Sequence, residues 1–354
     1  MKKAIYSLLA IYFMTEITNA QVTLNANGEG NTYEDINAVL APNYDVVEVP
    51  DCAHSGFGRH IDEIFDEELN TYVFRFIAHT AYDNDRCKKF DRQRIEIKSY
   101  GKSPENTKGS EGETVEYKWK FKLPSNFKVS KNFTHLHQIK SVGSEYSSRP
   151  IISLTARKGT PDRLELRYAP TYEQSTIKSV ELDLLKGHWV EVTEVIHYSN
   201  KGSYSIEIKK ISNDSKIFEY SNDYMDMWQD GSDFSRPKWG IYRSLKRKED
   251  LKDEMVLFNS FSIDEIADIT IEELSIKAHK KLLKVDNKKA VVNFKNLKAK
   301  DYDSVKLFDN NGEEIVIKKR LKKYKLDISE LNTGLYYIAF LKSKRVVKVL
   351  KYNL

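Results

Sequence analysis

The sequence predicts an all-β protein: a jelly roll, that is, a concanavalin-like sandwich of two sheets, followed by a small C-terminal β-sandwich. Three observations support this fold class. Short runs of apolar and aromatic residues alternate with polar residues at a period of two. Gly, Pro, Asn and Asp separate these runs at regular intervals. Helical periodicity is almost absent, and we expect only short helical pieces at 33–40 and 62–68.

Composition limits the classes of function. The chain has 354 residues, of which 31% are charged, and this length suits one large domain plus a small one. A net charge of +5 and a pI near 8.7 fit an anionic partner. The excess of base is too small to indicate nucleic acid, and no helix-turn-helix, zinc-finger or RNP-type pattern is present. We therefore expect no nucleic-acid partner.

The first 20 residues read as a secretory signal peptide. Met1-Lys2-Lys3 precedes the apolar run 4–13, and a stretch ending at Ala20 resembles a cleavage site. The apolar run is too short to span a membrane, and no other segment comes close. We predict domains at 1–20 (signal peptide), 21–277 (jelly roll) and 278–354 (small C-terminal sandwich), and a secreted or cell-surface protein that is a monomer.

Cys52 and Cys87 are the two cysteines of the chain. An exported protein meets an oxidising compartment, so we read them as a disulfide that ties the N-terminal segment to the body. A catalytic pair or a metal pair is the alternative, and no CxxC spacing supports it.

The strands of the large domain follow a polar lead-in at 21–50. The cleanest is 114–123, in which Val115, Tyr117, Trp119, Phe121 and Leu123 form one face and charged residues the other. One buried and one wet face is expected in an antiparallel sandwich. Further strands are predicted at 72–79, 92–98, 134–142, 151–156, 163–168, 176–182, 188–198, 203–211, 216–220, 238–243 and 256–263.

Three of these strands carry the candidate site. Alternation in 92–98 places Gln93, Ile95 and Ile97 on one face, and Arg92, Arg94, Glu96 and Lys98 on the other. In 134–140, His135 and His137 share one face and Gln138 and Lys140 the opposite one. In 238–243, Trp239 and Ile241 face the core, opposite Lys238, Gly240 and Tyr242. A row of cations facing away from the core suits an anionic ligand, and a solvated edge strand is the alternative.

After about residue 277 the chain becomes a Lys-rich set of short strands, predicted at 290–294, 304–308, 314–318, 325–328, 334–341 and 344–352. The runs from Val305 to Glu314 and from Leu326 to Ile338, with a basic strand at the end, resemble the C-terminal sorting domain of the type IX secretion system of Bacteroidetes. That resemblance implies export by the secretion machinery. An accessory carbohydrate-binding module is the alternative.

The three strands also resemble the groove strands of jelly-roll polysaccharide lyases. The segments are Arg92 to Lys98, His137-Gln-Ile-Lys140 and Lys238 to Arg243. Alginate lyases of this fold carry Arg-x-Glu-Leu-Arg, Gln-Ile-His and Tyr-x-Lys-Ala-Gly-x-Tyr in the corresponding places. The stretch 91–263 is more similar to glucuronan and ulvan lyases, and a secreted Bacteroidetes enzyme with a sorting tail most resembles an ulvan lyase. One departure is Lys140, which stands where the alginate lyases have the histidine of Gln-Ile-His.

The resemblance implies β-elimination of a uronate polysaccharide, for which roles can be assigned. Arg94 and Gln138 are chosen to neutralise the uronate carboxylate and stabilise the enolate-like charge. Tyr242 is chosen as the acid, or as both acid and base, and His137 as the other base candidate, with His135 behind it. His137 reaches the groove only if a bulge or twist turns it there. Residues expected to bind the anionic chain are Arg92, Lys98, Lys140, Lys238, Arg243 and His135.

We expect no required cofactor and no catalytic metal, while the Asp83-Asn84-Asp85 loop leaves room for a structural calcium ion. His135 and His137 lack the third ligand that a metal site needs. The expected substrate is ulvan, cut internally, with glucuronan, alginate or heparin-type polymers as alternatives, sulfated ones included. A glycoside hydrolase would need two carboxylates on one face, and Glu265 and Asp268 fall on opposite faces. A non-catalytic binding module with the same groove also remains open.

Overall fold

The computed structural model describes residues 21–266 and, further along, 283–286, 291–294, 304–309, 314–315, 325–327, 331–332, 334–342 and 345–353. The predicted signal peptide and the predicted boundary at 277/278 lie outside these residues. Within the described part of the chain, no helix is both long enough and apolar enough to cross a membrane.

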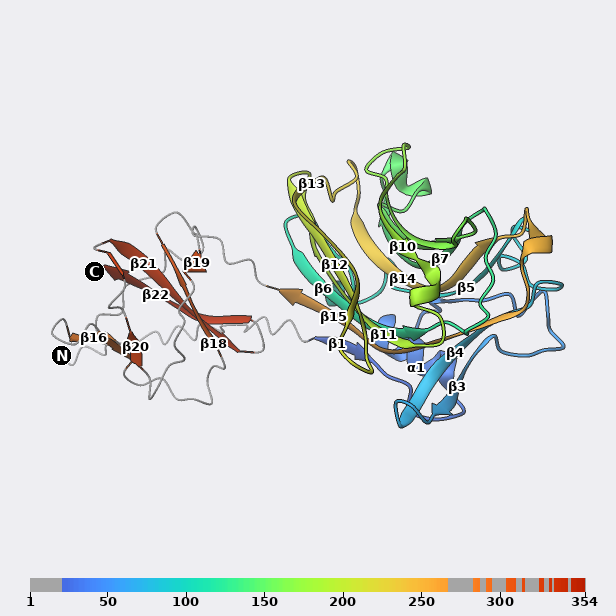
Figure 1. Ribbon diagram of the computed structural model, residues 1–354, viewed down its shortest axis with the longest axis horizontal. Helices are drawn as coiled ribbons and strands as arrows, with labels where there is room; N and C mark the ends of the chain where they lie inside the picture. Colours follow the sequence, from blue (N-terminus) through green and yellow to red (C-terminus); the bar gives the residue numbers. More distant parts are fainter. Residues whose placement is uncertain are drawn as a thin grey trace, which may run out of the picture.

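Residues 21–266 form two stacked antiparallel sheets (Figure 1). The first sheet has the order β13-β12-β11-β6-β15-β4-β3, with β1 paired to β15. Its strands are β1 (Val22–Leu24), β3 (Ile61–Asp66), β4 (Thr71–Ala78), β6 (Thr114–Lys122), β11 (Trp189–His197), β12 (Gly202–Lys210), β13 (Lys216–Met225) and β15 (Glu254–Ile266).

The second sheet carries the candidate site and has the order β10-β9-β8-β7-β14-β5-β2. Its strands are β2 (Val47–Glu48), β5 (Arg92–Lys98), β7 (Thr134–Val142), β8 (Ile152–Arg157), β9 (Arg163–Tyr168), β10 (Ser175–Glu181) and β14 (Phe234–Ser244). The helical pieces are α1 (Thr32–Leu40) and four 3-10 turns, η1 (Glu105–Thr107), η2 (Glu145–Ser148), η3 (Leu182–Leu184) and η4 (Lys248–Asp250).

The core lies between the two sheets, as the alternation of β6 predicts. The predicted apolar face of this strand is at most 1% exposed. Its Trp119 ring lies 6.1 Å from the ring of Trp239 on β14 in the opposite sheet. Burying large rings from both sheets in one layer is the main favourable contribution to folding. The predicted two-sheet sandwich is therefore confirmed.

One element prediction is wrong. The stretch 62–68, expected to hold a helical piece, begins as strand β3, paired to β4. Ile61 and Glu63 are buried while Asp62 and Ile64 are partly exposed, which is a period of two. The short edge strands β1 and β2 were not predicted either, because two or three residues are too few to show a period.

Two irregularities in the second sheet control which side chains reach its outer face. The register of β7 against β8 shifts between His135 and His137. The register of β14 against β7 shifts between Trp239 and Tyr242. Such bulges insert an extra residue and turn the side chains on either side of it. Gly240 lies in the second bulge at φ 140°, where a Cβ would lie 2.1 Å from the Ile95 carbonyl oxygen. The backbone of the neighbouring strand β5 therefore lies close to this glycine.

The described C-terminal residues form two further antiparallel sheets. One has the order β16-β17-β20 and the other β19-β18-β21-β22. The strands are β16 (Leu283–Asp286), β17 (Val291–Phe294), β18 (Ser304–Phe308), β19 (Glu314–Ile315), β20 (Lys325–Asp327), β21 (Leu335–Lys342) and β22 (Arg345–Asn353). All except β16 fall on predicted strands.

We predict that Gly240→Ala destabilises the protein, because the new methyl group overlaps the β5 backbone at a φ that favours glycine. The free energy of unfolding should fall by about 1–3 kcal/mol in denaturant titrations. The matched control is Gly101→Ala, whose Cβ would meet nothing closer than 3.9 Å. Equal stability of the two variants would contradict the bulge geometry.

Candidate active site

A pocket of about 340 Å³ opens on the face of the second sheet that points away from the core. Strands β5, β14 and β7 lie side by side beneath it, so the three predicted segments do form one surface. Eight lysine and arginine side chains and one carboxylate line the pocket. The full lining is Glu48, Arg86, Arg92, Arg94, Phe133, His135, Gln138, Lys140, Ser148, Arg149, Pro150, Arg157, Gln174, Arg236, Lys238 and Tyr242.

Strand register sets Tyr242 at the centre of this surface. It pairs with Arg94 on β5 and with His135 on β7. The Arg94 guanidinium lies 3.6 Å above the Tyr242 ring, and Arg92 donates to the phenol oxygen at 3.0 Å. Because the phenol oxygen accepts that bond, its own hydrogen is available to a ligand.

His135 and not His137 faces the pocket. The bulge at Leu136 breaks the shared face expected of the two histidines and turns His135 toward Tyr242, with ring centroids 5.8 Å apart. The predicted position of His137 in the groove is therefore wrong, although the bulge it required exists. A metal held jointly by the two histidines is also excluded, since they lie on opposite faces of the sheet.

His137 belongs to the core. Its side chain is fully buried, and its Nε2 lies 2.9 Å from Glu194 Oε2. Its ring lies against Trp119, with centroids 4.3 Å apart. A buried carboxylate needs a polar partner, and His137 is a hydrogen-bond partner of Glu194 on the first sheet.

His135 is held as a neutral imidazole beside the pocket. It is 7% exposed, it stacks on Phe133 with centroids 4.8 Å apart, and its Nδ1 makes no hydrogen bond within the described residues. Burial, and then the charge of Arg157, hold the pKa of His135 well below its ordinary value. The imidazole is therefore neutral at neutral pH, which is the form that acts as a base.

Two carboxylates that the sequence did not assign to the site organise its cations. Glu96 on β5 and Glu48 on β2 are paired across the two strands. Lys238 lies between them, with Nζ 2.6 Å from Glu48 and 2.8 Å from Glu96. Burial alone would raise the pKa of Glu48, but its cationic neighbours outweigh burial and keep that pKa far below the usual range. Glu48 is therefore ionised.

Arg94 and Gln138 face the pocket as predicted, but their donors are already engaged. Arg94 bonds to Glu96, and its Nε lies 3.0 Å from Asp85 Oδ1. The Gln138 amide also donates to Glu96. Neither is free to bind a uronate carboxylate without giving up a buried partner, so the structure favours a positioning role for both.

The predicted binding cations divide into three groups. Arg92 and Lys140 line the pocket, and burial with neighbouring positive charge lowers the pKa of Lys140 to about 8. Lys238 lines it too but is held between carboxylates, and Lys98 lies outside the lining, 2.7 Å from Glu48. Arg243 is a correction: it is fully buried on the core face, where it bonds to Gln93.

That position of Arg243 follows from alternation, since it stands one residue after Tyr242 and so shares the face of Trp239 and Ile241. Arg157 and Arg236 were missed. Each lines the pocket and has a buried Nε with no hydrogen-bond partner among the described residues. Arg236 could have been found, because it lies two residues before Lys238 on the same strand face. Arg157 ends β8, which carried no recognised motif.

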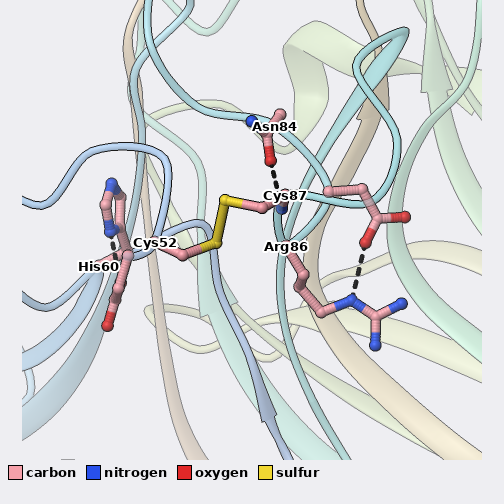
Figure 2. The surroundings of a disulfide bond; sticks show 7 residues. Cys52, His60, Asn84, Arg86 and Cys87 are labelled. Atoms are coloured by element: carbon pink, nitrogen blue, oxygen red, sulfur yellow. Dashed lines mark hydrogen bonds and ion pairs between the residues drawn. A yellow bond between two sulfur atoms is a disulfide. The ribbon is translucent and has the colours of Figure 1, made fainter.

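The Cys52–Cys87 disulfide is present, as predicted. Figure 2 shows it joining the segment beside His60 to the segment of Asn84 and Arg86. The side chains of 83–85 point to different partners. Asn84 accepts from the Cys87 amide at 2.7 Å, Asp85 binds Arg94 and Arg86, and Asp83 contacts histidines. These three side chains therefore do not gather round one calcium ion.

A second hollow, of about 480 Å³, lies between the edge strands β10 and β13. Its lining contains neither histidine nor arginine, and it lacks any acid–base pair like that of His135 and Tyr242. The chemistry of the described residues therefore points to the pocket on β5, β14 and β7.

Two family models match parts of this chain. Residues 74–262 match the family model described as "Polysaccharide lyase". Residues 286–351 match that described as "Secretion system C-terminal sorting domain", which points to export and to a secreted or cell-surface location. No curated protein matches the chain.

Several solved structures are similar in fold at low identity. An endo-β-1,4-glucuronan lyase from the fungus Trichoderma reesei shares 14% identity over 58% of this chain and 86% of its own, with a TM-score of 0.41. A marine PL-14 alginate lyase from Aplysia kurodai shares 16% identity over 70% of this chain and 99% of its own, with a TM-score of 0.47. An alginate lyase from Pseudomonas aeruginosa shares 12% identity over 62% of this chain and 96% of its own, with a TM-score of 0.42.

The family model covers more than half of the chain, including every strand beneath the pocket except β2. The chain belongs to the polysaccharide lyase family, as an enzyme that carries a C-terminal secretion sorting domain.

Proposed function

We propose that this lyase cleaves a sulfated, uronate-containing polysaccharide of the ulvan type by β-elimination, cutting within the chain. The observation that carries the proposal is the pairing of a neutral, unpartnered His135 with Tyr242 in a strongly cationic pocket. Uronate elimination needs a base for the C5 proton, an acid for the leaving oxygen, and cations for the carboxylate.

The proposed reaction divides these tasks among the residues. The His135 imidazole takes the C5 proton of the uronate, and the electrons of that C–H bond form the C4–C5 double bond. The bond from C4 to the glycosidic oxygen breaks, and Tyr242 gives its proton to that oxygen. The products are an unsaturated uronate end and a new reducing end.

The uronate carboxylate must be neutralised while the proton leaves, because an ionised carboxylate makes C5 very weakly acidic. We assign this to Arg157, which lines the pocket and whose charge acts on His135. Arg92 adds a second donor beside Tyr242. Arg94, the candidate from sequence, instead fixes the Tyr242 ring from above.

Charge favours a sulfated polymer over a plain polyuronate. Eight cations line the pocket against Glu48, with Glu96 and Asp85 engaged by the cations at its floor. This excess is larger than one carboxylate requires. Lys140, Arg149 and Arg236 line the pocket and suit sulfate esters on neighbouring sugars.

The test is ultraviolet absorbance of the unsaturated uronate during incubation with ulvan, glucuronan, alginate and heparin in parallel. We expect the signal to grow fastest on ulvan. Tyr242→Phe keeps the ring under Arg94 but removes the acid, so the rate should fall at least about 10²-fold with an unchanged circular dichroism spectrum. Growth of signal on none of the polymers, with retention on a polysaccharide column, would leave a binding module. A near-normal rate in Tyr242→Phe would refute the role of the phenol.

Replacing each histidine by glutamine separates the base from the core residue. His135→Gln should lower kcat about 10²–10⁴-fold with little change in unfolding temperature, because it removes the base. His137→Gln should lower the free energy of unfolding by about 1–3 kcal/mol, because Glu194 loses a well-placed partner, while the folded enzyme keeps its kcat. The reverse pattern would return the base to His137. Full activity in both variants would leave Tyr242 acting as base and acid.

A further inference from the structure

Three histidines and one aspartate converge on one point outside the proposed active site. His54 lies in the loop after β2, His60 directly precedes β3, His79 directly follows β4, and Asp83 lies in the next loop. Each offers one nitrogen or carboxylate oxygen, and these atoms all lie within 4.8 Å of one another. His60 and Asp83 are buried, and the other two are partly exposed.

The Asp83 carboxylate is at the centre of this cluster. Its Oδ1 lies 3.0 Å from His60 Nε2 and 3.1 Å from His54 Nδ1, and its Oδ2 lies 3.3 Å from His79 Nδ1. Ligand atoms bound tetrahedrally to Zn²⁺ at about 2.1 Å stand about 3.4 Å apart. The contacts to Asp83 are close to this spacing, and all four ligand atoms lie within 4.8 Å of one another, so small side-chain movements would bring them around one ion.

His79 supplies an independent sign of a missing partner. Its Nδ1 is buried and lies 3.3 Å from Asp83 Oδ2, but it makes no hydrogen bond within the described part of the chain. Buried polar atoms are nearly always hydrogen-bonded, so this nitrogen has an unused lone pair or proton that an ion in the cluster would satisfy.

The surroundings match the outer shell of a metal site. Asp51 Oδ1 lies 2.6 Å from His60 Nδ1 and so directs His60 Nε2 toward the cluster, as carboxylates do for metal-bound histidines. The Phe57 ring lies 4.2 Å from that of His79, and the Tyr82 ring 4.7 Å from that of His54. These rings limit the access of water to the cluster.

We propose that His54, His60, His79 and Asp83 bind one divalent transition-metal ion, Zn²⁺ in first place. Three imidazoles and one carboxylate are borderline ligands that suit Zn²⁺ and do not suit Ca²⁺, which takes six or more oxygens. Four protein ligands complete a tetrahedral shell, so the site is structural and its ion takes no part in the elimination. This proposal departs from the expectation of no metal.

A metal ion at this site would hold in place the loop after β4, which carries Asp83 and Asp85 and supports the pocket. Gln93, on the core side of β5, donates to the backbone oxygens of His79 and Asp83 at 3.2 and 3.3 Å. Two residues after Asp83, Asp85 holds Arg94. The Cys52–Cys87 disulfide joins the segment before His60 to the segment after Asp83 (Figure 2). The ion and the disulfide would act together to fix the counter-ions of Arg94.

The experiment uses the full chain with its disulfide intact, dialysed against a chelator and then titrated with Zn²⁺ in competition with a chromophoric indicator. We expect one equivalent of Zn²⁺ per chain and a rise of several degrees in unfolding temperature on loading. Co²⁺ in place of Zn²⁺ should give the intense visible absorption of a four-coordinate ion. None of these readouts depends on lyase activity.

The variants are His54→Gln and His79→Gln, which alter the two more exposed ligands and so leave a folded chain to titrate. Each should weaken Zn²⁺ binding at least about 10-fold and remove most of the thermal shift. The control is His188→Gln, an exposed histidine outside the cluster, which should bind Zn²⁺ like the parent. Binding that is unchanged in both variants would overturn the proposal. Absence of both binding and thermal shift in the parent chain would do the same, and would leave a hydrogen-bonded network centred on Asp83.

Discussion

The pocket depends on Lys238, which lies between the buried carboxylates of Glu48 and Glu96. Two ionised carboxylates side by side in a buried position repel each other strongly, and neither would stay charged without a cation between them. Lys238 bonds to both, and Arg94 and Gln138 complete the shell of Glu96. Removing one member of such a network leaves an unpaired buried charge, which costs more than the loss of an exposed pair.

This network explains how so many positive charges share one face of a sheet. Cations on neighbouring strands would repel one another and separate, but the carboxylates at the floor hold the inner ones in fixed positions. The outer ones, including Arg157 and Arg236, line the pocket, and each has a buried Nε without a hydrogen-bond partner among the described residues. In the proposed reaction, the inner cations position the site and the outer ones bind substrate. Burial, and then the positive charges of Arg157 and Arg94, hold the pKa of His135 well below its ordinary value and so favour the neutral imidazole.

The sequence predicted the fold well and the site in part, and the difference has a physical reason. Period-two runs such as 114–123 report burial directly, so the strands beneath the pocket and the grouping of Arg94, Gln138 and Tyr242 were predicted correctly. Strict alternation alone would have placed Arg243 on the core face, where it lies, but its charge led us to assign it to the groove. The exchange of His135 for His137 was not predictable, because a bulge depends on pairing with two neighbouring strands and leaves no mark in one strand's sequence. Glu48 comes from a two-residue strand, and the His54, His60, His79 and Asp83 cluster comes from four separate places in the chain. Neither Glu48 nor this cluster has a local sequence pattern from which its position could be predicted.

The central claim is that His135 and Tyr242 act together on one sugar in this pocket. The most direct measurement is a crystal structure of the Tyr242→Phe variant with a uronate oligosaccharide bound. The account predicts a uronate carboxylate against Arg157, with a ring nitrogen of His135 within about 3–3.5 Å of C5 and the glycosidic oxygen beside residue 242. An oligosaccharide bound in the hollow between β10 and β13, or a uronate whose C5 faces away from His135, would contradict it.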